Sequence, residues 1–251
     1  MSASPTSQLE DQAVGLRKMF EQSLPQVHVF ACPSRPNAVL PLVQMLASDL
    51  ATKGRRVLWV DEIDFPDREA WPLPRQVPFD LQRALDREVD LAQAVVPITS
   101  QLWYAFTRRK ARDCDANLSQ RLAQSGVAFD LVLVSARCKL DDTYAQYKNQ
   151  VKLLLLSGAK ADALSLTMAW AQNLHLSGGI DVSRVVFMGG SNSGAGAELW
   201  QDVKTQLLPP GQGDDPAISL IPALPAKTKL ASLWAKQTLF LEQLQRDFWK
   251  D

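Results

Sequence analysis

Residues 27–61 constrain the fold more than any other part of the sequence, because they place an amphipathic run between two short apolar ones. Residues 27–32 and 56–61 are rich in β-branched and aromatic side chains, which is typical of buried strands. Residues 38–53 carry apolar side chains at helical spacing, and Gly54 follows at the position of a helix C-cap. Strand, helix and strand in so short a span predict a βαβ unit with two parallel strands.

Strand-like and helix-like runs continue to alternate along the rest of the chain. We therefore expect an α/β domain with a mostly parallel sheet and helices on both faces. This domain should span residues 25–251, after an N-terminal arm over residues 1–24. Residues 102–106 and the basic residues that follow them are interpreted as an aromatic and basic patch. Further strands are expected at 95–99, 130–135, 152–157, 184–188 and 218–221, and further helices at 80–85, 90–94, 118–125, 162–174, 198–208 and 227–249.

Composition and charge narrow the class of protein. The chain has 251 residues, of which 46% are hydrophobic and 22% charged, as is ordinary for a globular protein with one large core. Its formal net charge is zero, so overall charge gives no argument for nucleic acid as a partner. Cys32, Cys114 and Cys138 are too far apart to suggest a metal site or a disulfide framework. No apolar run reaches the ~20 residues of a spanning helix. We expect a cytoplasmic protein whose contact with the membrane or cell pole is at most peripheral.

Three groups of residues could carry chemistry. A glycine-rich loop at 189–196 follows a strand and opens a helix, where backbone N–H groups can bind phosphate. It lacks the Lys-Ser/Thr ending of a phosphate loop, and a flexible connection is the better interpretation. His28 and His175 are far apart in sequence and are interpreted as core or surface residues. Four acids after the second strand could bind a metal ion, but they are interpreted as a solvated loop, and we expect no metal: Glu62, Asp64, Asp67 and Glu69.

The arm contains a short amphipathic helix. Ser7 can cap its start, with Glu10 three residues on as the capping-box partner, and Pro25 ends it. From the pattern alone, this helix would cover an apolar patch of its own domain. Its apolar side consists of Leu9, Ala13, Leu16 and Phe20.

The sequence of this helix resembles a motif of the flagellar-number regulators, the FlhG or FleN family of the MinD/ParA-like class. That motif is Asp-Gln-Ala-x-x-Leu-Arg, and here the helix reads Asp11-Gln12-Ala13-Val14-Gly15-Leu16-Arg17. The βαβ unit follows at the right distance, and weaker likenesses extend over nearly the whole chain, at 56–61, 130–135, 162–163 and 221–222. The resemblance implies the fold of a P-loop NTPase.

The resemblance also implies a partner, FlhF, which is a GTPase of the signal-recognition type. The helix would dock beside the nucleotide of FlhF, with Gln12 supporting the attacking water in trans. An amide suits that role because it can donate and accept a hydrogen bond at once. Asp11 and Arg17 would position the helix, and Leu16 would anchor its apolar side next to Ala13 of the same partner-binding motif. Flagellar basal-body components and a second copy of the chain are further candidate partners.

The sequence departs from the family at the nucleotide site. A phosphate loop needs glycines for close backbone approach, lysine for charge and Ser/Thr for magnesium, and the family has Lys-Gly-Gly-x-Gly-Lys-Thr. Here Pro33-Ser34-Arg35-Pro36-Asn37 has no glycine, no lysine and no Ser/Thr at its end, and its two prolines lack N–H groups. Ser135 stands where the family has the switch aspartate, and Asn192 is the nearest substitute for the base-contacting asparagine. Asp61 remains at the end of the second strand.

The altered loop predicts a pseudo-ATPase without a cofactor, and the resemblance implies a regulator of flagellum biosynthesis or placement that acts by protein interaction. Two alternatives stay open. One is an active MinD-like ATPase that binds ATP and magnesium through an unorthodox loop such as 189–196. The other is a binding module for positioning at the cell pole or division site. Relatives use a C-terminal amphipathic helix on membranes, but acids dilute the basic charge of 227–249, so we predict that this helix packs on its own domain.

Overall fold

The computed structural model describes residues 25–63, 77–108, 122, 128–137, 151–158, 161–178, 182–188 and 217–221. Several predicted features lie outside these residues: the arm helix with Asp11, Gln12, Ala13, Leu16 and Arg17, the acids Asp64, Asp67 and Glu69, the loop at 189–196 with Asn192, and the helices at 198–208 and 227–249.

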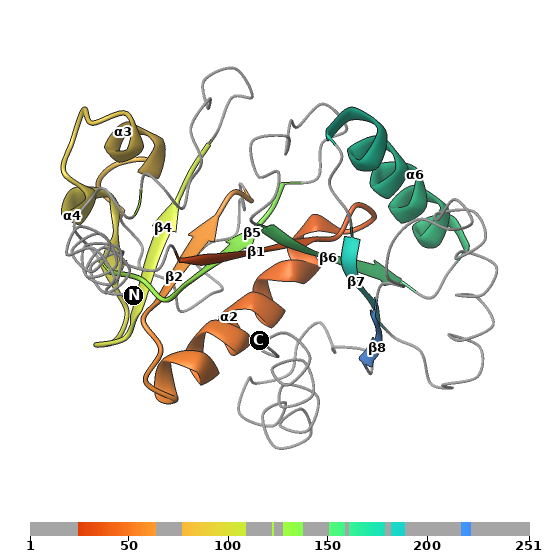
Figure 1. Ribbon diagram of the computed structural model, residues 1–251, viewed down its shortest axis with the longest axis horizontal. Helices are drawn as coiled ribbons and strands as arrows, with labels where there is room; N and C mark the ends of the chain where they lie inside the picture. Colours follow the sequence, from red (N-terminus) through yellow and green to blue (C-terminus); the bar gives the residue numbers. More distant parts are fainter. Residues whose placement is uncertain are drawn as a thin grey trace, which may run out of the picture.

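The centre of the structure is an eight-stranded sheet with the order β3-β4-β2-β5-β1-β6-β7-β8 (Figure 1). All neighbouring strands are parallel except β3, which runs antiparallel to β4. The predicted β1 and β2 are parallel, but β5 lies between them. The strands are β1 Gln26–Ala31, β2 Val57–Asp61, β3 Val96–Pro97, β4 Leu102–Phe106, β5 Leu131–Ser135, β6 Val151–Gly158, β7 Val182–Met188 and β8 Ala217–Ile221.

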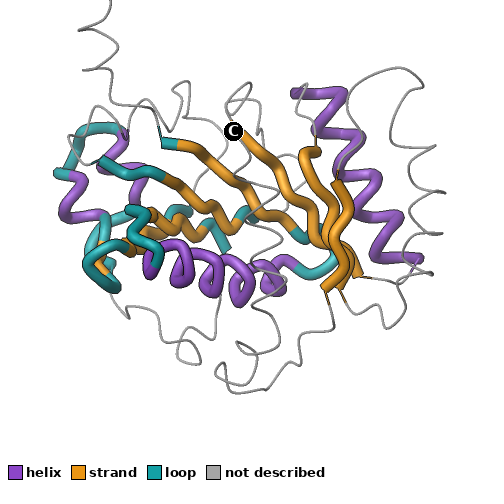
Figure 2. Tube along the Cα trace, turned by 60° about the horizontal axis from the view of Figure 1, so that its bottom comes forward, coloured by secondary structure: helices purple, strands orange, loops and turns teal. Residues whose placement is uncertain are grey.

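Helices cover both faces of the sheet, as predicted (Figure 2). A 3₁₀ turn, η1 (Pro36–Ala38), leads into α2 (Val39–Thr52), which packs on one face. The other face carries α3 (Leu81–Leu85), α4 (Leu91–Ala94) and α6 (Ala161–Gly178). In the described part of the chain, no helix has the length and apolar character needed to cross a membrane.

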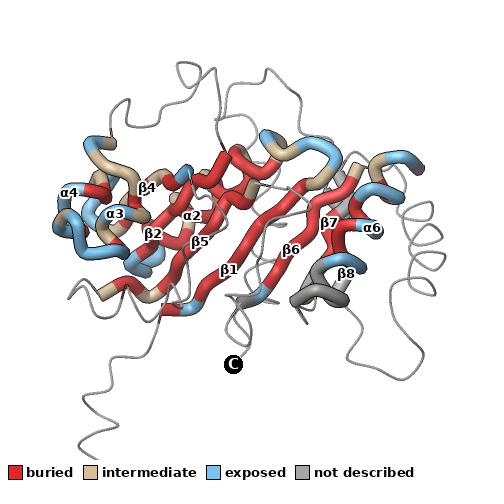
Figure 3. The backbone as a smooth tube through the Cα atoms, turned by 90° about the horizontal axis from the view of Figure 1, so that it is seen from above, coloured by how far each residue is buried: buried red, intermediate tan, exposed pale blue. Residues whose placement is uncertain are grey.

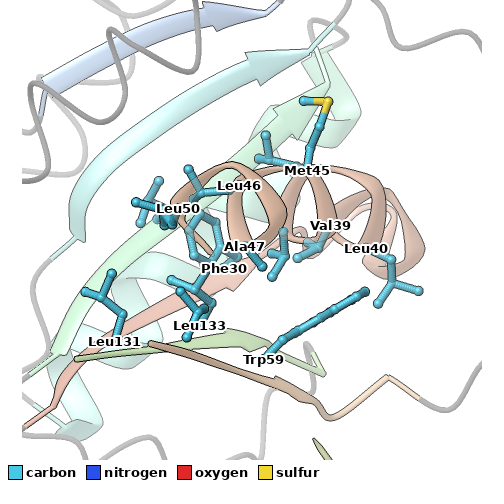
Figure 4. Packing of buried hydrophobic residues seen from close by; sticks show 14 of the residues in the cluster. Phe30, Val39, Leu40, Met45, Leu46, Ala47, Leu50, Trp59, Leu131 and Leu133 are labelled. Atoms are coloured by element: carbon cyan, nitrogen blue, oxygen red, sulfur yellow. The ribbon is translucent and has the colours of Figure 1, made fainter. Parts of the chain in front are cut away.

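Alternating side chains of the central strands build two cores. In β1, Val27, Val29 and Ala31 pack toward α3, α4 and α6, whereas Phe30 packs toward α2, because successive strand residues point to opposite faces. Figure 3 shows that the central strands are buried along most of their length. Figure 4 shows Phe30 and Trp59 on the side of the sheet that faces α2.

The interpretation of residues 102–106 as a patch missed a strand. These residues form β4, with Leu102 and Tyr104 each 1% exposed in the core under α2. The basic character begins only after the strand, where the Arg108 guanidinium lies 5.9 Å from the centre of the Phe106 ring. The two-residue β3 forms the edge beyond β4, and Pro97 protects this edge from further strand pairing because it has no N–H group.

Gly54 ends α2 as the sequence predicts. It has a positive φ of 84°, and its N–H donates to the Ala51 carbonyl at 3.0 Å. The Arg55 N–H reaches back to the Leu50 carbonyl at 3.1 Å, so both groups satisfy carbonyls at the helix end. A Cβ atom at Gly54 would meet nothing within 4 Å, and only the left-handed backbone conformation disfavours other residues here.

We therefore expect Gly54→Ala to lower the free energy of unfolding by about 1 kcal/mol, since a left-handed conformation strains any residue with a Cβ. Urea denaturation followed by circular dichroism measures the change. Lys53→Ala, at the neighbouring exposed position, is the control and should change the free energy of unfolding by less than about 0.5 kcal/mol. An unchanged midpoint for Gly54→Ala would show that α2 does not depend on this cap.

Candidate functional site

The candidate site lies at the carboxyl ends of the central strands. In open α/β sheets, ligands bind in the crevice beyond these ends, and an anion is favoured at the N-terminus of the helix that follows the first strand. Here β1 lies at the centre of the sheet, and the connection that leaves it, residues 32–38, leads directly to α2. The ends of β2, β4 and β5 lie beside it in the sheet order.

The connection after β1 is a turn closed on itself. The Arg35 N–H donates to the Cys32 carbonyl at 3.1 Å, and the Ala38 N–H donates to the Arg35 carbonyl at 2.9 Å. Pro33 and Pro36 have no N–H groups to offer. These four positions therefore give a phosphate no free backbone donor, which is the feature on which a phosphate-binding loop depends.

Cys32 lies at the base of this turn and is fully buried. Its sulfur lies 3.7 Å from the Ser34 hydroxyl, and the backbone N–H groups of Ser34 and Arg35 also point toward it. Burial raises the pKa of the Cys32 thiol, and these hydrogen bonds with the Arg35 charge oppose the shift only in part. Cys32 is thus a packed, protonated thiol and not an activated nucleophile.

Asp61 occupies its predicted place at the end of β2, but its carboxylate faces the protein interior. It is 2% exposed. One oxygen accepts a hydrogen bond from the Tyr104 hydroxyl at 2.9 Å, and the other accepts one from the Ile63 N–H at 2.8 Å. These bonds join β2 to β4 and fix the first residues after β2. The carboxylate has a structural role in this arrangement.

Ser135 ends β5 and is also fully buried. Its hydroxyl accepts a hydrogen bond from the Trp59 indole N–H at 2.9 Å. The Trp59 ring in turn meets the Tyr104 ring edge to face, with centroids 5.2 Å apart. Ser135, Trp59, Tyr104 and Asp61 thus form one connected group beneath α2, which we call the buried quartet.

Main-chain hydrogen bonds extend the sheet beyond the quartet. The Glu62 N–H donates to the Ser135 carbonyl, the Thr107 N–H to the Asp61 carbonyl and the Ala136 N–H to the Phe30 carbonyl, each at 2.9 Å. The chain therefore remains tied to the sheet for a further residue after β2, β4 and β5. Among the described residues, no group of three or more His, Cys, Asp or Glu side chains could hold a metal ion.

The sequence identified part of this site. It singled out Asp61, Ser135 and the 33–37 loop, and the structure places all of them at the carboxyl ends of the central strands. It gave no role to Trp59 or Tyr104. Their polar atoms were the available signal, because a buried indole N–H or phenol needs a hydrogen-bond partner.

His28 lies within the central strand β1, two residues before Phe30, and is fully buried. Burial and, as the smaller cause, the charge of Lys152 together lower its pKa to about 3. His28 is therefore neutral at physiological pH and takes no part in the site at the carboxyl ends. Of the two interpretations left open for this histidine, core or surface, the structure supports the core.

Comparison with solved structures identifies the fold. The MinC:MinD cell division protein complex of Aquifex aeolicus matches with a TM-score of 0.57 and 14% identity, over 87% of this chain and 85% of that chain. A putative plasmid partition protein from Borrelia burgdorferi, bound to AMPPNP, matches with a TM-score of 0.59 and 13% identity, over 87% and 99%. Cobyrinic acid a,c-diamide synthase from Mycobacterium smegmatis, with ADP and magnesium, matches with a TM-score of 0.60 and 14% identity, over 90% and 96%.

No protein-family model matches the sequence, and no curated protein matches it. At this low identity the structural likenesses establish the fold alone, and the activity has to be argued from the residues of the site. The chain has the α/β fold of MinD and the plasmid partition proteins, and the predicted fold class is confirmed.

Proposed function

We propose that this protein is a MinD-like pseudo-ATPase that regulates flagellum biosynthesis or placement through protein interaction. One observation carries the proposal: in the turn from β1 to α2, the N–H groups of Ser34 and Arg35 point to Cys32, and that of Ala38 bonds to the Arg35 carbonyl. The proteins of this fold reported above with AMPPNP or with ADP and magnesium hold a nucleotide. This chain shares the fold, but in its own loop the N–H groups of Arg35 and Ala38 are already bonded within the turn.

The chemistry of the loop supports the loss of nucleotide binding. A triphosphate needs several backbone donors and a positioned lysine, and it needs a hydroxyl to bind magnesium. Arg35 is the only cationic side chain of 33–37, and it is exposed to solvent. Asp61 bonds to Tyr104 and Ile63 instead of facing the crevice. A single exposed arginine would attract a phosphate only as weakly as the two charges of a surface ion pair attract each other.

The first test is nucleotide binding to the full chain. Isothermal titration with Mg-ATP should give no saturable heat in the micromolar range, and nucleotide should be absent from the purified protein. Arg35→Ala is the matched control and should give the same trace, since no phosphate contact is lost. A clear saturable heat that survives Arg35→Ala would contradict the proposal and favour an active ATPase that uses another loop, such as 189–196.

The interaction side of the proposal rests on the arm. Its motif resembles the helix with which FlhG-type proteins contact the GTPase FlhF, and the chain retains the glutamine at position 12. A glutamine delivered in trans can orient the water that attacks the γ-phosphate of the partner. This function does not need a nucleotide in the protein that supplies the helix. Loss of the phosphate loop and retention of Gln12 are therefore compatible.

The second test is a multiple-turnover GTPase assay of FlhF with the full chain, and with a peptide of residues 1–24. We expect stimulation by both, and a loss of at least tenfold with Gln12→Ala, which is about 1.4 kcal/mol of transition-state stabilisation. Gln8→Ala removes an amide outside the motif and should leave stimulation unchanged. An inert wild-type arm, or equal activity of the two variants, would contradict the flagellar proposal and leave a binding module for the cell pole or division site.

A further inference from the structure

The buried quartet joins three neighbouring strands near their carboxyl ends, where a ligand of this fold would be expected. Trp59 and Asp61 belong to β2, Tyr104 to β4 and Ser135 to β5. In the sheet register, Trp59 stands opposite Tyr104 and Asp61 opposite Ser135, so all four side chains lie on the face that carries α2. Each of the four is at most 2% exposed.

We propose that the quartet is a clamp that holds the first residues after β2, β4 and β5, namely Glu62, Ile63, Thr107 and Ala136, in one arrangement. Its side-chain bonds, Trp59 to Ser135 and Tyr104 to Asp61, are both 2.9 Å long and buried. Hydrogen bonds in a water-free interior are stronger than at the surface and are costly to open, because the separated groups find no water. The clamp acts on the backbone through Ile63, whose N–H bonds to the Asp61 carboxylate.

The clamp predicts that the first residues after β2, β4 and β5 open rarely. Segments that respond to a ligand are drawn from the least stable parts of a fold and have few buried contacts. Here the residues that begin the three segments are bonded to strands instead: Glu62 to Ser135, Thr107 to Asp61 and Ala136 to Phe30. These first residues are therefore fixed relative to the sheet. This inference goes beyond the proposed function, because it concerns local opening and holds whichever partner binds.

Hydrogen exchange resolved to single amides tests the clamp in the full chain. In the wild-type protein, the amides of Glu62, Ile63, Thr107 and Ala136 should exchange at least a hundredfold more slowly than in an unstructured peptide. Tyr104→Phe removes one side-chain bond of the clamp with little change of volume. It should raise exchange at these amides at least tenfold more than at the β6 amides of Leu154 and Leu155.

Ser135→Ala removes the other side-chain bond and has a matched control. Ser157 is also a fully buried strand serine, and its hydroxyl lies 3.3 Å from that of Thr167, away from the quartet. Ser135→Ala should accelerate exchange at the clamp amides, whereas Ser157→Ala, in β6, should leave the clamp amides as they are in the wild type. Wild-type clamp amides that exchange as in a free peptide would overturn the proposal. Acceleration that is equal at the clamp and in β6 would also overturn it, since that pattern reports global unfolding alone.

Discussion

Asp61→Ala is expected to lower the free energy of unfolding by about 3 kcal/mol, because it leaves two buried donors without their partner. The Tyr104 hydroxyl and the Ile63 N–H both donate to the Asp61 carboxylate. When one member of a buried hydrogen-bonded group is removed, the remaining donors stay buried without a partner, and each of them costs free energy. Water cannot easily take the place of the Asp61 side chain, because that side chain is only 2% exposed. Equilibrium denaturation in urea measures this loss.

The direction of this effect separates a structural aspartate from a catalytic one. An aspartate kept for a metal or substrate is often neutral for stability, or unfavourable, since function and stability compete at such sites. Asp61→Asn keeps one acceptor oxygen and should lose less than Asp61→Ala. Asp86→Ala, at an exposed position, should stay within about 0.5 kcal/mol of the wild type. An Asp61→Ala protein as stable as the wild type would mean that its carboxylate is free for a ligand after all.

Much of the fold was predictable because its signals are local. The apolar period of residues 38–53 and the glycine that follows them gave α2 and its C-cap, and the apolar runs on either side gave β1 and β2. The order of strands is not a local property. The sequence could not show that β5 lies between β1 and β2, because that placement depends on pairing between segments far apart in the chain. The strand β4 was missed because the basic residues after it suggested a surface.

The candidate site was predictable only in its parts. Asp61 and Ser135 stood out by their places at the ends of strands, and the prolines of 33–37 indicated a loop without phosphate donors. Their partners did not stand out. The Trp59–Ser135 bond joins residues 76 positions apart, and the Tyr104–Asp61 bond joins residues 43 apart. A sequence pattern specifies the face of a strand, but tertiary packing decides which polar atoms meet there.

His28 gives the second large effect, an acid sensitivity of the folded state. Its pKa in the folded protein is lowered to about 3, whereas an ordinary histidine in an unfolded chain titrates near 6.5. Between these values the unfolded chain binds a proton that the folded protein does not. Stability from this group is therefore fully present above about pH 6.5 and is lost as the pH falls. We expect a loss of about 2 kcal/mol from pH 7 to pH 5, and about 3 kcal/mol by pH 4.

The comparison of wild type with His28→Leu isolates this contribution, because all other titrating groups are common to both proteins. Leucine suits the site, since His28 alternates with Val27 and Val29 in β1 and points to the same face as Phe30, toward the apolar core under α2. Urea denaturation at half-unit steps from pH 7.5 to pH 4 should give a shallower loss of stability for His28→Leu. Lys152→Gln removes the smaller cause of the lowered pKa and should reduce the acid loss only slightly. Equal slopes for wild type and His28→Leu would mean that His28 gains its proton in the folded protein as easily as in the unfolded chain. The strand β1 would then have to open to water around His28, although this side chain is completely buried in the folded protein.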